Sequence, residues 1–283
     1  MQKIIERQNE EQMLKVQFAA RYCYNRAELL NNILTYATLI NLLIFIPFPS
    51  NWMSFIRVST VVIDCILCII IFVMNKYVET GASLRNFFDA YVLDIGYKEY
   101  SLDARSKLFD IAFSIINKHP KLAKIQLNNT GSDSPPGVKS WYEFSFDLIR
   151  SDAIYTCQKA NAWWDKKLST SRIFRFFSFL IITIVTIICL RVIFNLSLLD
   201  LFLGSLAIII KLIERIIAAY KYHVLSIKID GALETISCNP KISYEIELQK
   251  MIEARRKIPV LGSNKAHIKS AKKLTEQFNT TQA

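Results

Sequence analysis

Long apolar runs alternate with charged blocks along the chain. Within these runs the charged residues are Asp64, Arg191 and Asp200. Each run is close to the roughly 20 residues that a helix needs to cross a hydrocarbon core of about 30 Å. We therefore interpret them as membrane spans; buried core helices of a soluble all-α protein are the alternative. The runs are residues 29–49, 58–74, 176–194 and 195–210.

The four runs form two pairs, and each pair is joined by a connection too short to hold a domain. This arrangement predicts an all-α membrane protein with four transmembrane helices in two hairpins and a helical cytosolic domain. The expected order is an N-terminal amphipathic cytosolic helix, a first hairpin, a central cytosolic helical domain, a second hairpin, and C-terminal cytosolic helices with a tail. The corresponding ranges are 1–28, 29–75, 76–172, 173–217 and 218–283.

Composition and charge support this topology. The chain has 283 residues, 52% of them apolar, and 35 Lys and Arg against 24 Asp and Glu, a net charge of +11. All of these cations except Arg57 and Arg191 lie outside the runs and their short turns. Basic segments stay on the cytosolic side of a membrane, so both termini and the central segment are expected in the cytosol. The positive charge is therefore a sign of topology and requires no DNA or RNA partner.

The segments outside the apolar runs are also predicted to be mainly helical. In the first, apolar or small residues recur every three or four positions, as on one helical face: Met13, Val16, Ala20, Cys23, Ala27 and Leu30. This seam fits either packing within the chain or self-association. Residues 82–118 predict two helices broken near Gly96, and residues 119–139 predict a polar loop. Further helices are expected over about 140–170, from the fourth span up to Gly231, and over 243–257.

Catalytic signatures are missing from the sequence. The three histidines lie far apart, and no metalloprotease, phosphate-loop, nucleophile-elbow or dinucleotide motif occurs. Cys65 and Cys68 form a CxxC inside an apolar run, where packed thiols are the expected state. We therefore expect no enzyme activity, no metal site and no cofactor.

Asp64 is the one charged residue within the second apolar run, residues 58–74. Ionisable residues inside a span often mark a pathway or a contact between helices. Asp64 is accordingly a candidate for a pore or interhelix role, with a water-exposed interfacial position as the alternative.

Aromatic and polar residues gather in two places in the central segment. One cluster, around Trp141 and Tyr142, follows the predicted loop, and the other extends from Cys157 to Leu168. Aromatic rings beside cations and amides can stack bases and hold phosphates. The second cluster also fits an aromatic and basic belt just before a span.

In their order along the chain, these pieces resemble the SMODS-associated four-transmembrane effector family, found beside bacterial cyclic-oligonucleotide synthases. The resemblance covers roughly residues 4–260 and fades at 260–263, where an aromatic-rich stretch is usual. The matching pieces are Arg7-Gln8-Asn9, Ala20-Arg21 with Tyr24 and Ala27, Phe88-Asp89, Trp141-Tyr142, Cys157-Gln158 to Asn161, Trp164-Asp165-Lys166 with Leu168, Leu248-Gln249 with Arg255, and Pro259.

This resemblance implies an antiphage effector of the CBASS type in the bacterial inner membrane. It implies that the protein senses a cyclic di- or trinucleotide from a neighbouring nucleotidyltransferase, acts as a homo-oligomer and disrupts the membrane, killing the infected cell. By residue type and place in or near the matching pieces, the candidate nucleotide contacts are Arg85, Trp141, Tyr142, Lys159, Asn161 and Trp164. A constitutive membrane scaffold, or a small ion channel or transporter, remains the alternative.

Overall fold

The computed structural model describes residues 2–43, 50–142, 149–194, 197–238 and 242–260. Over this part of the chain every regular element is helical, with one isolated β-bridge between Thr130 and Lys139. The all-α class is thereby confirmed. The α-helices are α1 (Gln2–Gln8), α2 (Glu11–Leu43), α3 (Met53–Leu93), α4 (Leu102–Lys118), α5 (Pro120–Asn128), α6 (Arg150–Phe194), α7 (Leu198–Cys238) and α8 (Ile242–Arg256), and two short 3-10 turns are η1 (Ser50–Trp52) and η2 (Tyr97–Glu99).

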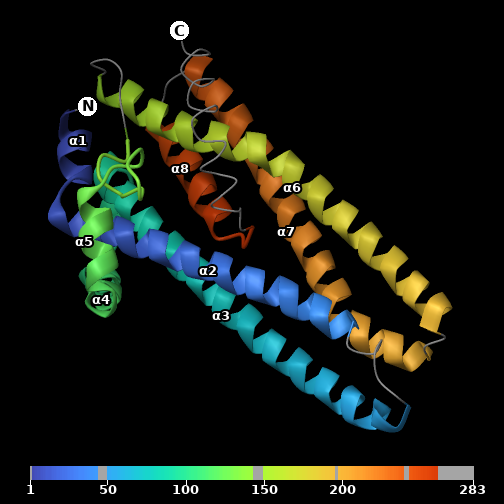
Figure 1. Cartoon of the computed structure of the whole chain (residues 1–283). Helices are drawn as coiled ribbons and strands as arrows, with labels where there is room; N and C mark the ends of the chain where they lie inside the picture. Colours follow the sequence, from blue (N-terminus) through green and yellow to red (C-terminus); the bar gives the residue numbers. More distant parts are fainter. Residues whose placement is uncertain (1, 44–49, 143–148, 195–196, 239–241, 261–283) are drawn as a thin grey trace.

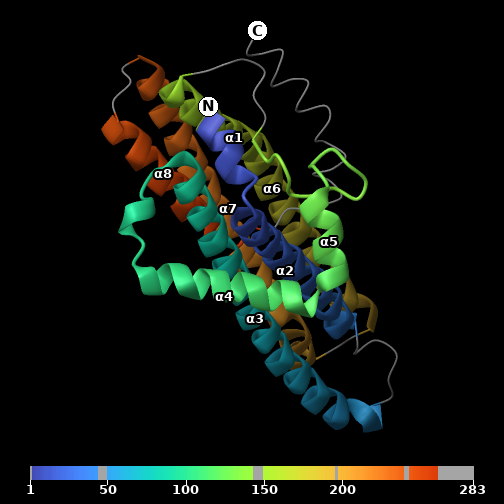
Figure 2. The same cartoon turned by 90° about the vertical axis from the view of Figure 1, so that its left-hand side faces the viewer.

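Two long antiparallel helix pairs, α2 with α3 and α6 with α7, form the frame of the molecule (Figure 1). The pairs lie side by side through contacts of α7 with α2 and α3. The short helices α1, α4, α5 and α8 gather at the end of the frame away from the tips of the pairs, and α4 crosses the bundle there (Figure 2). The molecule therefore has a narrow half made of long helices and a wider half with additional helices.

The two halves differ in where their apolar side chains point. On α3, Phe72 in the narrow half is 64% exposed, whereas Phe87 in the wide half is fully buried. On α6, Ile182, Ile188 and Ile193 are exposed in the narrow half, whereas Ala153 and Ile154 are buried. An apolar surface on all sides of long helices is typical of contact with lipid. We assign the narrow half to the membrane.

Two stretches, Ser54–Leu93 and Ile173–Ile193, are long and apolar enough to cross a membrane. Helix α3 has 41 residues and is about 60 Å long, twice the hydrocarbon thickness. Only its exposed half can lie in the bilayer, so the rest of α3 belongs to the wide half. The structure does not itself confirm the expected count of four, and residues 44–49 of the first expected span lie outside the described residues.

Helices α2 and α3 approach each other closely through the expected seam. Met13, Val16, Ala20, Cys23 and Ala27 are all buried, and α3 is the main partner of α2. The packing alternative for this seam is therefore confirmed.

Three expectations about local structure were wrong. The N-terminal segment is not one helix, because the chain turns at Asn9, whose side-chain carbonyl accepts the backbone N–H of Ser140. Residues 120–128 are helical rather than a loop, since Pro120 at the first turn suits a helix start. Helix α7 does not end at Gly231 but continues to Cys238.

Other expectations agree with the structure. The break near Gly96 is present, where Gly96 has φ 73° and Asp94 has φ 59°. Helix α8 covers nearly all of the predicted range 243–257. The helix expected over about 140–170 is present from Arg150, but residues 140–142 are not helical, with Ser140 at φ 52°, and residues 143–148 lie outside the described residues.

Gly81 on α3 is the point where the close approach can be tested. A Cβ there would lie 3.2 Å from Cys23 Cβ and 3.3 Å from the Ala20 carbonyl oxygen. We expect Gly81→Leu to force the helices apart and to lower the free energy of unfolding by about 1–3 kcal/mol. Thermal unfolding of the purified protein in detergent measures this.

Gly231→Ala is the matched control, because a Cβ at this helical position would have no described atom within 4 Å apart from the backbone of its own helix. Loss of a helical glycine should leave the stability unchanged or raise it by up to about 1 kcal/mol. An unchanged melting temperature for Gly81→Leu contradicts the tight α2–α3 contact.

Candidate functional site

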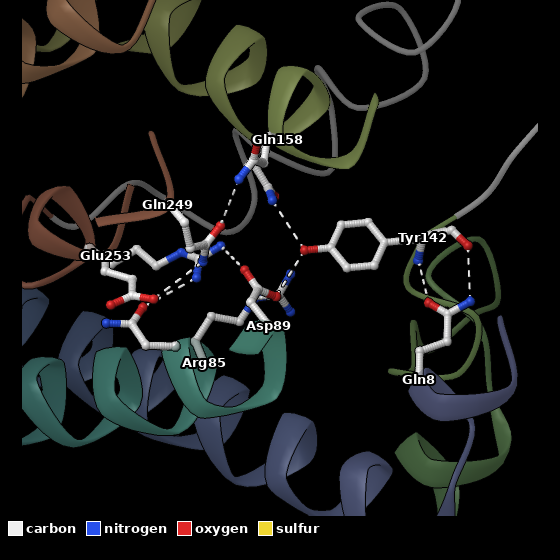
Figure 3. A network of polar contacts seen from close by, with 10 residues as sticks. Gln8, Arg85, Asp89, Tyr142, Gln158, Gln249 and Glu253 are labelled. Carbon is white, nitrogen blue, oxygen red and sulfur yellow. Dashed lines mark hydrogen bonds and ion pairs between the residues drawn. The ribbon is translucent and has the colours of Figure 1, made fainter. Parts of the chain in front are cut away.

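The carboxylate of Asp89 lies at the centre of the wide half and is fully buried. Arg256 donates from Nη2 to Asp89 Oδ2 at 2.6 Å, and Arg85 Nε lies 3.7 Å from Oδ1 (Figure 3). The Tyr142 hydroxyl donates to Oδ1 at 2.8 Å. One carboxylate from α3 is thus shared by a second residue of α3, by the C-terminal end of α8 and by the loop before α6.

Tyr142 is itself held in place by Gln8 of α1. The Gln8 side chain accepts the Tyr142 backbone N–H at 2.7 Å and donates to its carbonyl at 3.0 Å. Asn161 of α6 donates to the Tyr142 hydroxyl at 3.1 Å. The amide groups of α1 and α6 therefore fix the ring that donates to Asp89.

A second row of polar groups joins α6 to α8. Gln158 donates to the Gln249 side chain at 3.2 Å, and Gln249 donates to Glu253 at 3.4 Å. Arg255 donates to the backbone carbonyl of Asn161 at 3.3 Å, and Arg256 Nη1 donates to Asn86 Oδ1 of α3 at 3.2 Å. We call the whole set the Asp89 network: Gln8, Arg85, Asn86, Asp89, Tyr142, Gln158, Asn161, Gln249, Glu253, Arg255 and Arg256.

Charge balance keeps Asp89 ionised. Burial by itself raises the pKa of the Asp89 carboxyl, but the Arg256 and Arg85 guanidinium groups outweigh it and hold the pKa below its usual value. Burial raises the pKa of Tyr142 above its usual range, so the phenol keeps its proton and acts as a donor. The centre of the network is therefore a charged carboxylate, which accepts hydrogen bonds from Arg256 and Tyr142 and forms an ion pair with Arg85.

Four of the six candidate nucleotide contacts meet at this network. Arg85, Tyr142 and Asn161 belong to it, and the Arg85 guanidinium lies 4.2 Å from the Trp141 ring centroid. Trp141 is 41% exposed, whereas Arg85 is only 7% exposed. At the Arg85–Trp141 stack the network thus reaches the surface.

The remaining candidates are placed differently. Lys159 lies over the Tyr155 ring at 5.8 Å and makes no contact with Asp89. The side chain of Trp164 lies outside the described residues. Both stay predictions as nucleotide contacts, as do the four that meet.

Asp64 makes a contact between helices. Asn41 of α2 donates to Asp64 Oδ1 of α3 at 2.8 Å, within the first hairpin. This agrees with the interhelix alternative, and a pore role stays a prediction.

A small cavity of about 260 Å³ opens beside the network, between the C-terminal end of α3 with η2 and helix α8. Its lining includes Gly96, Tyr100, Gln249 and Glu253. Pockets that enclose drug-sized ligands have about 300–1,000 Å³. A cyclic dinucleotide is larger than such ligands, so this cavity cannot enclose one.

Metal ligands do not come together in the part of the chain that the structure describes: no three His, Cys, Asp or Glu side chains are placed to hold an ion. Cys65 and Cys68 are both exposed on the apolar surface of α3, so the expectation that these thiols are packed was wrong.

Sequence reasoning missed the residue at the centre. In the sequence, Asp89 is only one residue of a matching piece, and nothing there assigns it a role; the same holds for Gln8, Gln158, Gln249 and Arg255. The signal was available in those pieces, because five of the eight short motifs that carry the family resemblance contribute residues to one network.

Asp89→Asn tests the network. The substitution leaves Arg85 and Arg256 buried without a counter-charge, so we expect a loss of about 3–5 kcal/mol in stability at neutral pH. Because folding lowers the pKa of Asp89, its contribution is complete at neutral pH and is lost as the pH falls through the folded-state value. The gap between variant and wild type should therefore narrow in acid.

The exposed Asp110 of α4 provides the control. Asp110→Asn should leave the melting temperature in detergent nearly unchanged. Equal melting temperatures for Asp89→Asn and Asp110→Asn at pH 7 contradict a structural role for the Asp89 carboxylate.

No curated protein and no solved structure matches the chain. A family model described as the SMODS-associating 4TM effector domain matches residues 2–224, which include α1 to α6 and over half of α7. Since this match covers well over half of the chain, the protein belongs to the SMODS-associating 4TM effector family of membrane effectors.

Proposed function

We propose that this protein is an inner-membrane effector that senses a cyclic di- or trinucleotide and then permeabilises the membrane. The family name ties the chain to SMODS nucleotidyltransferases, which supports a cyclic oligonucleotide as the signal. Permeabilisation of an infected cell is then the antiphage output. The proposal includes no catalytic step and no cofactor.

The observation that carries the proposal is the Asp89 network together with the continuous helices that leave it. Helices α3 and α6 each contribute to the network and run without a break into the apolar half. A helix transmits a tilt or shift along its whole length. A change at Asp89 can therefore reach the membrane with no intervening hinge.

The Arg85–Trp141 stack offers the chemistry for recognising a nucleotide. A phosphodiester attracts a guanidinium, and a base stacks on an indole ring. Of the two ion pairs on Asp89, the one to Arg85 at 3.7 Å is looser than the one to Arg256 at 2.6 Å. A ligand phosphate that competes with Asp89 for Arg85 thus alters the network at its weaker link.

Ligand binding has to be stronger in one state than in the other to shift the equilibrium. The described cavity is too small to enclose a cyclic dinucleotide. We therefore propose that the binding-competent state either opens the network around Arg85 or lies between copies of the chain in a homo-oligomer. Both termini then lie in the cytosol with the wide half.

Leakage from liposomes tests the proposal. Purified protein is reconstituted with an encapsulated dye and titrated with a panel of cyclic di- and trinucleotides. We expect one nucleotide to cause dye release. Trp141→Ala should raise the concentration needed by about 5- to 150-fold, because stacking of one base contributes about 1–3 kcal/mol.

Lys121→Ala, at an exposed position of α5, is the matched control and should behave as wild type. Leakage without any nucleotide indicates a constitutive channel instead. No leakage and no binding with any member of the panel overturns nucleotide sensing.

A further inference from the structure

Two cations are buried on α7 within the half of the molecule assigned to the membrane. Lys211 is 5% exposed and Arg215 is 4% exposed. They are four residues apart and so share one helix face. Ile210, Ile213 and Ile217 on the same helix are exposed, so the outer face is apolar where the inner face is basic.

The groups that accept hydrogen bonds from these cations are neutral. Lys211 Nζ donates to Thr35 Oγ1 of α2 at 2.7 Å. Arg215 donates from Nη1 to the Pro259 carbonyl and from Nη2 to Met74 Sδ of α3. Its Nε is buried and has no hydrogen-bond partner among the described residues. Within the described part of the chain, neither cation has a carboxylate oxygen within 4.0 Å.

Two neighbouring buried charges of the same sign are costly without a counter-charge. In the wide half, Asp89 supplies such a counter-charge to Arg85 and Arg256. Within the described part of the chain, the carboxylate that acts on Lys211 and Arg215 is that of Glu214 on their own helix, which forms no ion pair with either. A halide or an oxyanion would accept hydrogen bonds from the Nε–H of Arg215 and from the remaining N–H groups of Lys211 Nζ.

We propose that Lys211 and Arg215 form an anion-binding site inside the membrane bundle, near its cytosolic end. The site takes a small inorganic anion, of the chloride or phosphate class, or the phosphate of an anionic lipid. As a part of the permeation path, which rests on the proposed function, it makes the path selective for anions, as rings of basic side chains do in anion pores.

The binding experiment does not depend on permeation. The melting temperature of the full chain in neutral detergent is measured while gluconate is replaced by chloride or phosphate at constant ionic strength. A parallel titration uses phosphatidylglycerol. We expect one of these anions to stabilise the wild type and the apparent affinity to fall about tenfold or more in Lys211→Met and in Arg215→Met.

Lys221→Met, at an exposed position of the same helix, is the control and should keep the wild-type response. Stabilisation by inorganic anions identifies an aqueous source, and stabilisation by phosphatidylglycerol alone identifies a lipid phosphate. Equal responses in the wild type and both buried-site variants, or no response to any anion, overturn the site.

The permeation arm uses planar bilayers with a salt gradient and the activating nucleotide. We expect the reversal potential of the wild type to lie near the equilibrium potential of the anion. In Lys211→Glu it should shift toward the equilibrium potential of the cation. A conductance without anion preference that Lys211→Glu does not alter overturns the selectivity role. No nucleotide-induced conductance at all overturns the proposed function, and the melting experiment still decides on the anion site.

Discussion

A single buried carboxylate organises the wide half of this protein. Asp89 is fully buried and ionised, and it can remain so only while Arg85, Arg256 and Tyr142 stay in place. Each of these partners belongs to a different part of the chain or is fixed by one, including α1 through Gln8 and α6 through Asn161. The positions of α1, α3, α6 and α8 relative to one another therefore depend on the side chains that compensate one buried charge.

The membrane imposes the second constraint. In the narrow half, lipid replaces water, so apolar side chains point outward and cannot drive the helices together. Close backbone approach and a few polar contacts between helices take over that role, as between Asn41 and Asp64 and between Lys211 and Thr35.

The sequence predicts the helical class and the location of the apolar runs because both are local properties that repeat every turn. It also points to Arg85, Tyr142 and Asn161 by residue type. It does not reveal Asp89 as the centre, since the partners of Asp89 lie 53 residues away at Tyr142 and 167 away at Arg256. Pairing over such separations depends on the tertiary fold. The turn at Asn9 also depends on the tertiary fold, because the Asn9 side-chain oxygen accepts the backbone N–H of Ser140.

The end of α8 links the two buried groups of charges. Arg256 donates to Asp89, and three residues later the Pro259 carbonyl accepts from Arg215. Three residues span at most about 10 Å even when extended, so the backbone positions of Arg256 and Pro259 constrain each other. The carboxylate of the wide half and the cations of the membrane half are therefore coupled through the chain itself, in addition to the long helices. A displacement of the end of α8 that separates Arg256 from Asp89 therefore also displaces the Pro259 carbonyl, a neutral acceptor of Arg215.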